Sequence, residues 1–275
     1  MAGELIDSFC ALEDICRAHK HAKIPMFVPF SPDPRGMEKL AMDVRHHMGV
    51  ENGVVFDYFE LFENTGFRII VLPMLKPVES FSYYDRINQN AFYFINGRMN
   101  PERQLFKLAY EMGRILILTC SLQYGGEMFA PDSDLEEDRK KPFTAHRAAR
   151  RFAACFLMPE PAVRETVSQL GIKREQWSYQ LLLRIKHRFG TSTETFLYRL
   201  DELGLVDSKL VKPLLKKIEG FYKDTDFCEP DCSRRVLTPN GRLWDLVLVG
   251  KQSETHQDEV KAIEQTLTDL KVVKL

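Results

Sequence analysis

The feature that most constrains this chain is a long segment of helical periodicity that begins at Asn100-Pro101. Asparagine is a favoured N-cap residue and proline fits the first helical position, so this pair predicts the start of a helix. Apolar side chains then recur at helical spacing, at Leu105, Leu108, Met112, Ile115 and Leu116. Because these positions fall on one face, we expect a helix that turns this face toward a core.

The same helix carries Tyr110-Glu111-Met112-Gly113-Arg114, which has the frame of the H-E-x-x-H zinc-peptidase motif. In that motif two histidines one turn apart bind a zinc ion, and the glutamate between them reaches the metal-bound water. Here Glu111 is kept, whereas Tyr110 and Arg114 replace both histidines. Arginine only donates hydrogen bonds and stays protonated, so Arg114 cannot be a ligand. Tyr110 would bind a metal only as phenolate, which a reference pKa of about 10 disfavours.

A purely structural interpretation of these residues is also open. Glu111 and Arg114 are three positions apart, so they can form an ordinary helix ion pair that contributes roughly 0.2–0.5 kcal/mol. The pentapeptide alone favours this interpretation, and only the surrounding motifs change the balance.

Composition limits the class of protein. The chain has 275 residues, of which 44% are hydrophobic, enough for a true core in one large or two modest domains. Its formal net charge is −1, so no global basic field attracts nucleic acid. Asp7 and Ser8 interrupt the first apolar segment, which argues against a secretory signal, and no apolar run is long enough to cross a bilayer. The six cysteines are few for this length, which favours a reduced, cytoplasmic protein.

One close cysteine pair, Cys228 and Cys232, offers either a structural zinc site or two free thiols in a loop. Zinc would need a second pair of ligands, and only His256 lies downstream. Two free thiols are therefore the expected state.

The periodicity of the whole chain predicts many helices and one group of short strands. Helical spacing predicts helices at 4–21, 36–49, 54–65, 144–157, 174–189, 192–203, 213–220 and 254–272. β-branched and aromatic runs predict strands at 67–73, 81–85 and 91–95. Asn240-Gly241 predicts a hairpin turn, and residues 246–249 would continue its second strand. The short turn at 189–192 between two helices is typical of a helix-turn-helix.

Several separated motifs agree in order and spacing with one known family. Residues 63–66 are similar to its E-x-x-G approach to the first strand, and residues 102–114 to its R-x-x-F lead and H-E-x-G-H helix. Residues 149–159 are similar to A-x-x-F-A-A-x-L-L-M-P, and residues 187–205 to its F-G-V-S and R-L-x-x-L-G helix pair. Over roughly residues 38–206 the chain therefore resembles the ImmA/IrrE family of bacterial zinc metallopeptidase-like proteins.

This resemblance implies an α+β fold that is mostly helical. A small three-stranded sheet would pack on the signature helices in a zincin-like arrangement, followed by a helix-turn-helix-like bundle and a small C-terminal α+β tail. The implied segments are an N-terminal helix with a proline-rich link at 1–37, a metallopeptidase-like domain at 38–160, a helical subdomain at 161–220, and a hairpin plus helix at 221–275. The first segment is too short for a complete DNA-binding domain, which counts against a self-contained transcription factor.

The resemblance also implies a third zinc ligand, a glutamate six residues before the phenylalanine of the F-A-A motif. That position is His146 here, so Tyr110, Arg114 and His146 occupy the three former metal seats. Histidine can bind zinc, but one imidazole beside a guanidinium does not make a site, because zinc needs at least three good protein ligands. We expect no metal cofactor, with zinc the cofactor if this expectation fails, and we favour a partly exposed helix residue for His146.

Active relatives of this kind cut a helix-turn-helix repressor, or a similar partner, in response to stress or to signals from mobile elements. We therefore favour a catalytically degenerate pseudo-peptidase that regulates such a system by binding a protein or peptide partner, for example through an added strand at the sheet edge. The partner would be a helix-turn-helix repressor or a similar protein. No membrane partner is expected.

Two alternatives stay open. The first is an active metalloendopeptidase with a rearranged site, in which Glu111, His146 and an acidic residue such as Asp132 or Asp134 hold the metal. The second is a DNA- or ligand-binding transcriptional regulator, because basic residues between 173 and 188 could contact phosphates and Arg114 could bind an anion. Nucleic acid has the weaker support, since the helix at 192–203 carries several acidic side chains.

Overall fold

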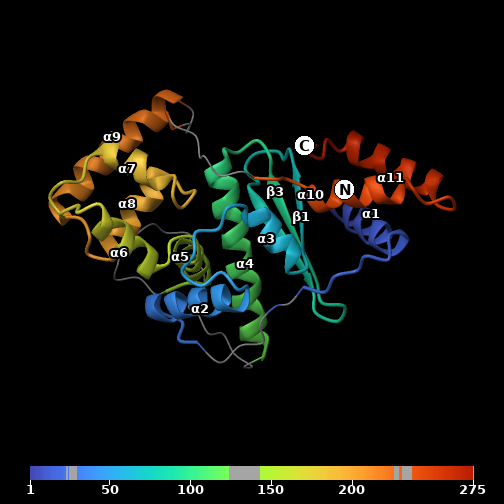
Figure 1. Ribbon diagram of the computed structural model, residues 1–275, viewed down its shortest axis with the longest axis horizontal. Coiled ribbons are helices and arrows are strands. Elements are labelled where there is room, and N and C mark those ends of the chain that lie inside the picture. The colour runs from blue at the N-terminus through green and yellow to red at the C-terminus, as the bar shows by residue number, and fades with distance from the viewer. Residues whose placement is uncertain (23, 25–29, 124–142, 226–228, 231–236, 275) are drawn as a thin grey trace. The chain divides into compact units, whose positions relative to one another are not determined.

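The computed structural model describes residues 1–22, 24, 30–123, 143–225, 229–230 and 237–274 (Figure 1). Contacts within the chain divide it into two compact units. Unit 1 comprises Met1–Ile24, Asp57–Met99 and Val236–Leu275, and unit 2 comprises Pro25–Phe56 and Asn100–Arg235. Each unit therefore joins segments that are far apart in the sequence, and the four-part division inferred above stays a prediction.

Unit 1 is built around a three-stranded sheet of β1 (Phe67–Leu72), β2 (Ser80–Asp85) and β3 (Asn90–Asn96). β3 lies between the other two strands, parallel to β1 and antiparallel to β2. The three predicted strands are thus confirmed to within one residue at each end. Every residue of β1 is buried, which agrees with its unbroken run of apolar and β-branched side chains around one arginine.

The core of unit 1 lies on one face of this sheet. It is formed by α1 (Ala2–Ile15), α10 (Gly241–Gly250) and α11 (Gln257–Asp269), which lie close together in Figure 1. Alternate residues of two strands point into this core, namely Ile70, Leu72, Phe92 and Phe94. On the other face, Phe62 of α3 (Tyr58–Asn64) has its ring centroid 5.7 Å from that of Phe67 and 6.0 Å from that of Tyr93.

The predicted hairpin at Asn240-Gly241 is wrong, because α10 occupies residues 241–250. Its buried side chains follow the i, i+1, i+3, i+4 stripe of a helix rather than the alternation of a strand, at Leu243, Trp244, Leu246 and Val247. Asn240 does adopt the left-handed conformation that an Asn-Gly pair permits, with φ +58°, but here it precedes a helix. The described part of the C-terminal tail is therefore helical, whereas the predicted helix at 254–272 is confirmed as α11.

The side chain of Asn240 explains why the chain turns into a helix at this point. Its Oδ1 accepts a hydrogen bond from the Val71 N–H at 2.7 Å, and its Nδ2 donates to the Val71 carbonyl at 2.9 Å. Nδ2 also donates to the Val273 carbonyl at 2.8 Å. A fully buried amide thus covers the outer edge of β1, in contact with residues that lie far away in the sequence.

Glu63, in the E-x-x-G motif, is a buried acid with incomplete pairing. Its Oε2 accepts a hydrogen bond from the Arg242 N–H at 3.1 Å, while its buried Oε1 has no hydrogen-bond partner among the residues that the structure describes. Burial raises the pKa of this carboxyl from 4.5 to about 7. The hydrogen bond from the Arg242 N–H and the positive charge of Arg242 oppose this rise, whereas the negative charges of Asp57 and Asp245 add to it. Part of the Glu63 population is therefore protonated near neutral pH.

This raised pKa predicts a specific pH dependence of stability. Glu63 stabilises the fold fully below its unfolded pKa of 4.5, and this contribution is lost as the pH rises through about 7. The change is on the order of 3 kcal/mol. In Glu63→Gln we expect the decline between pH 4.5 and 7 to flatten, as measured by urea unfolding at each pH. Glu60→Gln, at an exposed site of the same helix, should keep the wild-type slope, and an unchanged slope in Glu63→Gln would contradict the assignment.

The described part of unit 2 consists of helices. They are α2 (Pro34–His47), α4 (Pro101–Gln123), α5 (Ala145–Leu157), α6 (Glu160–Gln169), α7 (Tyr179–Lys186), α8 (Thr193–Glu202) and α9 (Ser208–Thr225). Side chains of Asp33, Thr144, Ser178 and Ser192 cap four of the N-termini. These bounds confirm the helices predicted at 36–49, 144–157, 192–203 and 213–220. They also confirm the helix start predicted at Asn100-Pro101. In the part of the chain that is described, no helix is long and apolar enough to span a membrane.

Some helix boundaries differ from the predictions for local reasons. α1 ends at Ile15 rather than near residue 21, since Arg17 takes φ +49°. α3 and α7 begin late, at the N-caps Asp57 and Ser178, because these side chains accept backbone N–H groups. α6 was not predicted from the sequence. The proline after Met158 marks the end of α5, but prolines on either side of Glu160 are also compatible with the first turn of a new helix.

α4 and α5 pack side by side (Figure 1). Gly113 allows this close approach, because a Cβ atom there would lie 2.9 Å from the Phe152 ring and 3.3 Å from the Ala149 Cα. Ala149 and Phe152 are both buried on α5. The packing brings the two helices that carry Tyr110 and His146 together.

Candidate functional site

The glutamate of the motif is held by the arginine that replaces the second histidine. Glu111 is completely buried on α4, and its Oε2 accepts a hydrogen bond from Nη1 of Arg114 at 3.3 Å. The Arg114 side chain is about half exposed, with 51% of its surface accessible. The ion pair expected from the i, i+3 spacing therefore forms, and one carboxylate oxygen of Glu111 faces a fixed positive charge.

The side chains of Tyr110 and His146, the other two positions that the resemblance singled out, bind each other. The Tyr110 hydroxyl lies 2.8 Å from Nδ1 of His146, and the two rings meet nearly edge to face with centroids 5.5 Å apart. Tyr110 is largely buried, whereas His146 is exposed, as expected for it. The hydrogen bond joins α4 to α5, the same two helices that a zinc ion held by these seats would join.

Cations surround the Tyr110 ring as well. The Lys107 Nζ lies 5.0 Å from the ring centroid, and the Arg114 guanidinium carbon lies 6.0 Å from it. These positions, three before and four after Tyr110, place both charges on the same helix face. The aromatic ring attracts them through its quadrupole.

This donor set does not fit a zinc ion. The guanidinium of Arg114 has no lone pair to offer, and it adds a positive charge next to the seat. The Nδ1 atom of His146 is used by the hydrogen bond to Tyr110, whichever of the two groups donates. Among the residues that the structure describes, no group of three or more His, Cys, Asp or Glu side chains is placed to hold a metal. Asp132, Asp134, Cys228 and Cys232 lie outside the described residues, so the rearranged metal site and the cysteine pair stay untested.

The basic cluster near the helix-turn-helix-like pair is only partly available at the surface. Lys186 is fully buried and paired with Glu102 and Glu229. Arg188 donates from Nη1 to the Thr166 hydroxyl at 3.1 Å. The exposed members are Lys173, Arg174, Arg184 and Arg188 itself. The central lysine is therefore not available to bind phosphate. The buried faces of α7 and α8 pack inside the unit.

Comparison with known proteins gives the family. Residues 62–201, just over half of the chain, match the family described as the IrrE N-terminal-like domain, Peptidase_M78. The chain belongs to this family. The IrrE-like region runs from α3 to α8. It therefore includes the sheet, the helices α4 and α5 that carry the motif residues, and the pair α7 and α8.

Two further comparisons add little to this assignment. A solved structure named as a Mycobacterium tuberculosis transcriptional regulator is similar, with 17% sequence identity over 70% of this chain and a TM-score of 0.38. The IrrE-like chain spans about half of that protein, 51% of its length. A search of curated proteins found no match.

Sequence reasoning missed the buried ion pairs of unit 2. Lys186 lies on the buried stripe of α7, which Tyr179 and Leu182 also occupy.

 Seven positions separate Lys186 from Tyr179, which is about two helical turns, so the three side chains share one face. A lysine on such a stripe is the only signal in the sequence that could have pointed to a buried charge. Its partners, Glu102 and Glu229, come from distant parts of the chain and carry no such signal.

Proposed function

We propose that this IrrE-like protein is a pseudo-peptidase that regulates a repressor, stress-response or mobile-element system by binding a protein partner. The observation that carries the proposal is the pairing of the motif residues with one another. Glu111 is bound by Arg114, and Tyr110 is bound by His146. The groups that would hold a metal and activate water are therefore engaged in bonds that need no metal.

The chemistry of hydrolysis supports this proposal. A metallopeptidase needs a dication to lower the pKa of its bound water and to polarise the peptide carbonyl. A guanidinium cannot bind water in that way, because it has no site for an oxygen lone pair to coordinate. It also holds Oε2 of the Glu111 carboxylate in an ion pair, so this oxygen is already engaged.

The sheet of unit 1 supports peptide binding by strand addition. β1 is covered on its outer side by Asn240, whereas β2 is the other edge strand of the sheet. An extended peptide would therefore pair with β2, whose Tyr83 is 48% exposed and offers an aromatic contact. The partner we propose is a protein segment, such as part of a helix-turn-helix repressor, that is held without being cut.

Zinc content tests the proposal directly. After incubation with zinc and desalting, we expect the wild-type protein to carry no zinc above background in elemental analysis. The combined substitutions Tyr110→His, Arg114→His and His146→Glu restore three good ligands on α4 and α5. We expect about one zinc ion per chain in this variant, since three protein ligands and a water complete a tetrahedral site.

The matched control keeps Tyr110→His and Arg114→His but carries His146→Ala, and it should bind zinc more weakly because the third ligand is lost. One zinc per wild-type chain that disappears in His146→Ala would overturn the proposal. So would cleavage of a repressor by the wild-type protein that is lost both in Glu111→Gln and with a chelator, the result expected for the active alternative.

A further inference from the structure

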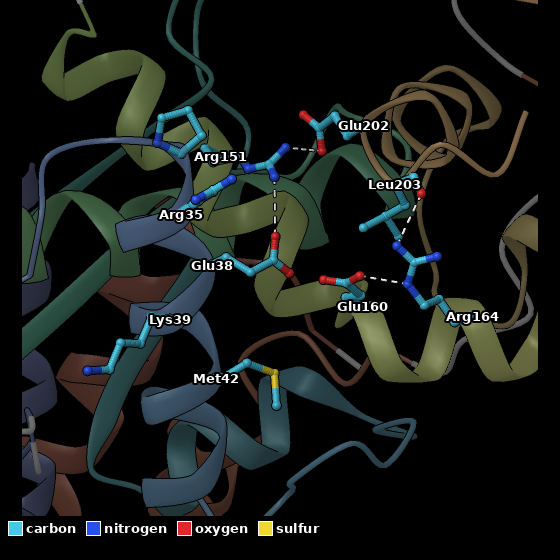
Figure 2. A pocket seen from close by; sticks show the side chains of 10 residues that line it. Arg35, Glu38, Lys39, Met42, Arg151, Glu160, Arg164, Glu202 and Leu203 are labelled. Atoms are coloured by element: carbon cyan, nitrogen blue, oxygen red, sulfur yellow. Dashed lines mark hydrogen bonds and ion pairs between the residues drawn. The ribbon is translucent and has the colours of Figure 1, made fainter. Parts of the chain in front are cut away.

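Unit 2 holds a charged pocket that the motif residues do not explain. It has a volume of about 450 Å³ and lies between α2, α5, α6 and α8 (Figure 2). Its size falls in the range of sites for small molecules. Most of its lining side chains are charged, and the apolar part comes from Pro34, Met42 and Leu203.

The carboxylates of this pocket are already paired with arginines. Glu38 accepts hydrogen bonds from Arg199 at 2.8 Å and from Arg151 at 3.2 Å. Glu202 forms an ion pair with Arg151, and Figure 2 shows the Arg151 guanidinium directed at both acids. Burial alone would raise the pKa of Glu38, but the hydrogen bonds and charge of Arg199 hold it below its ordinary value, so this acid stays ionised.

The third acid is paired in the same way. Arg164 donates from Nε to Glu160 at 2.6 Å and from Nη2 to the Leu203 carbonyl at 3.2 Å. All three carboxylates of the pocket are thus neutralised by the arginines beside them. A cationic ligand would have to compete with these arginines for every acid.

Two cations of the pocket have no such partner. Arg35 and Lys39 are exposed, and neither forms an ion pair with a residue that the structure describes. In Figure 2 the Lys39 ammonium is turned away from Glu38, but an exposed lysine changes rotamer within nanoseconds and can turn back. The buried Nε–H of Arg151 also has no acceptor in the described residues. The pocket therefore has an excess of positive charge and hydrogen-bond donors that a ligand could use.

This pocket is distinct from the former metal seats. Arg151 lies five positions after His146 on α5, so the two side chains point in directions roughly 140° apart around the helix. An occupant of the pocket would contact α2, α6 and α8, which carry none of the motif residues Tyr110, Glu111, Arg114 and His146.

We propose that this pocket binds a small phosphorylated molecule. A phosphate monoester carries up to two negative charges near neutral pH, which matches the two cations without carboxylate partners. Arginine binds phosphate oxygens through parallel N–H groups, and lysine supplies a point charge beside them. The apolar surface of Met42 and Leu203 would contact the organic part of the ligand. Such a site would give the regulator a chemical input, and it does not depend on whether the metal seats are inactive.

Calorimetric titration tests this site with defined probes. We would titrate inorganic phosphate and a nucleoside 5′-monophosphate into the full chain, with succinate and sodium chloride at matched ionic strength as comparisons. Saturable binding of the nucleotide, stronger than that of succinate, is the expected result. In Arg35→Ala/Lys39→Ala we expect the Kd to rise at least about tenfold, because each lost charge-assisted contact weakens binding. Both side chains are exposed, so this variant should fold like the wild type.

Lys209→Ala/Lys212→Ala provides the matched control, since it removes the same number of exposed charges from α9 and should leave the Kd unchanged. The proposal is overturned by equal weakening in both variants, by a signal that sodium chloride reproduces, or by preference for succinate. Binding of a phosphopeptide but of neither small phosphate would also overturn it, because the site would then recognise a protein. Zinc content is measured separately, so failure here leaves the pseudo-peptidase proposal standing.

Discussion

Replacing Lys186 by methionine is expected to lower the free energy of unfolding of unit 2 by about 3–5 kcal/mol. The Lys186 ammonium is fully buried, lies 3.0 Å from Oε1 of Glu102, and forms a second ion pair with Glu229. Methionine fills similar space but leaves two buried carboxylates without their counter-charge, and isolated buried charge is costly. Urea unfolding followed by circular dichroism measures the loss.

Two further variants make this result specific to the buried pair. Lys212→Met, at an exposed position of α9, should change stability by no more than about 0.5 kcal/mol. Adding Glu102→Gln and Glu229→Gln to Lys186→Met should recover part of the loss, because neutral amides replace the stranded charges. A loss below about 1 kcal/mol in Lys186→Met would falsify the assignment of Lys186 as the central charge of this cluster.

Replacing Glu13 by alanine should have a similar effect on unit 1, a loss of about 3–5 kcal/mol. Glu13 is fully buried on α1, and its Oε2 accepts hydrogen bonds from Nε and Nη2 of Arg68 at 3.0 and 2.5 Å. Its Oε1 accepts from Arg242 at 2.9 Å. The substitution leaves the Arg68 guanidinium buried over the Phe92 ring, 5.1 Å from its centroid, with a carbonyl of Lys20 as its remaining hydrogen-bond acceptor among the described residues.

Hydrogen exchange would show where this loss falls. We expect faster amide exchange in β1 and α10, which carry Arg68 and Arg242, with little change in α8 of unit 2. Glu4→Ala is the matched control on the same helix, because Glu4 is 58% exposed and pairs only with the N-terminus at 3.8 Å. If Glu4→Ala and Glu13→Ala cost the same, the buried network does not hold α1 to the sheet.

These buried networks bear on the proposed function. Lys186 and Arg199, both on the helix-turn-helix-like pair, turn inward and tie it to α4 and α2 through Glu102 and Glu38. The central cations of this helix pair therefore form internal ion pairs and are not available to bind the phosphates of a nucleic acid. This placement favours a scaffold that presents binding surfaces, in agreement with a pseudo-peptidase that recognises a protein.

Local signals predicted most elements of the fold. Asn100-Pro101 marks the start of α4, and apolar periodicity gives α2, α5, α8 and α11. β-branched runs give the three strands. These predictions succeed because capping, helical periodicity and strand propensity depend on neighbouring residues alone.

Prediction failed where distant contacts overruled a local signal. Asn240-Gly241 is a good hairpin turn by itself, but the Asn240 amide binds the Val71 backbone, so the chain continues as α10. The parallel pairing of β1 with β3 could not be predicted from the sequence either, since the order of strands depends on which edges remain free after packing. Lys186 falls among the basic residues that were expected to contact phosphates, but it pairs with carboxylates that lie far away in the chain.

The sequence by itself determined that Tyr110 and Arg114 stand where the motif has its two histidines, and that the guanidinium of Arg114 has no lone pair for a metal. It also determined which helix carries this altered motif. Only the tertiary structure decided which partners these side chains bind, namely the Tyr110–His146 hydrogen bond between α4 and α5 and the Glu111–Arg114 pair. Side-chain identity limits which bonds a residue can form, whereas packing between distant segments selects the bonds that do form.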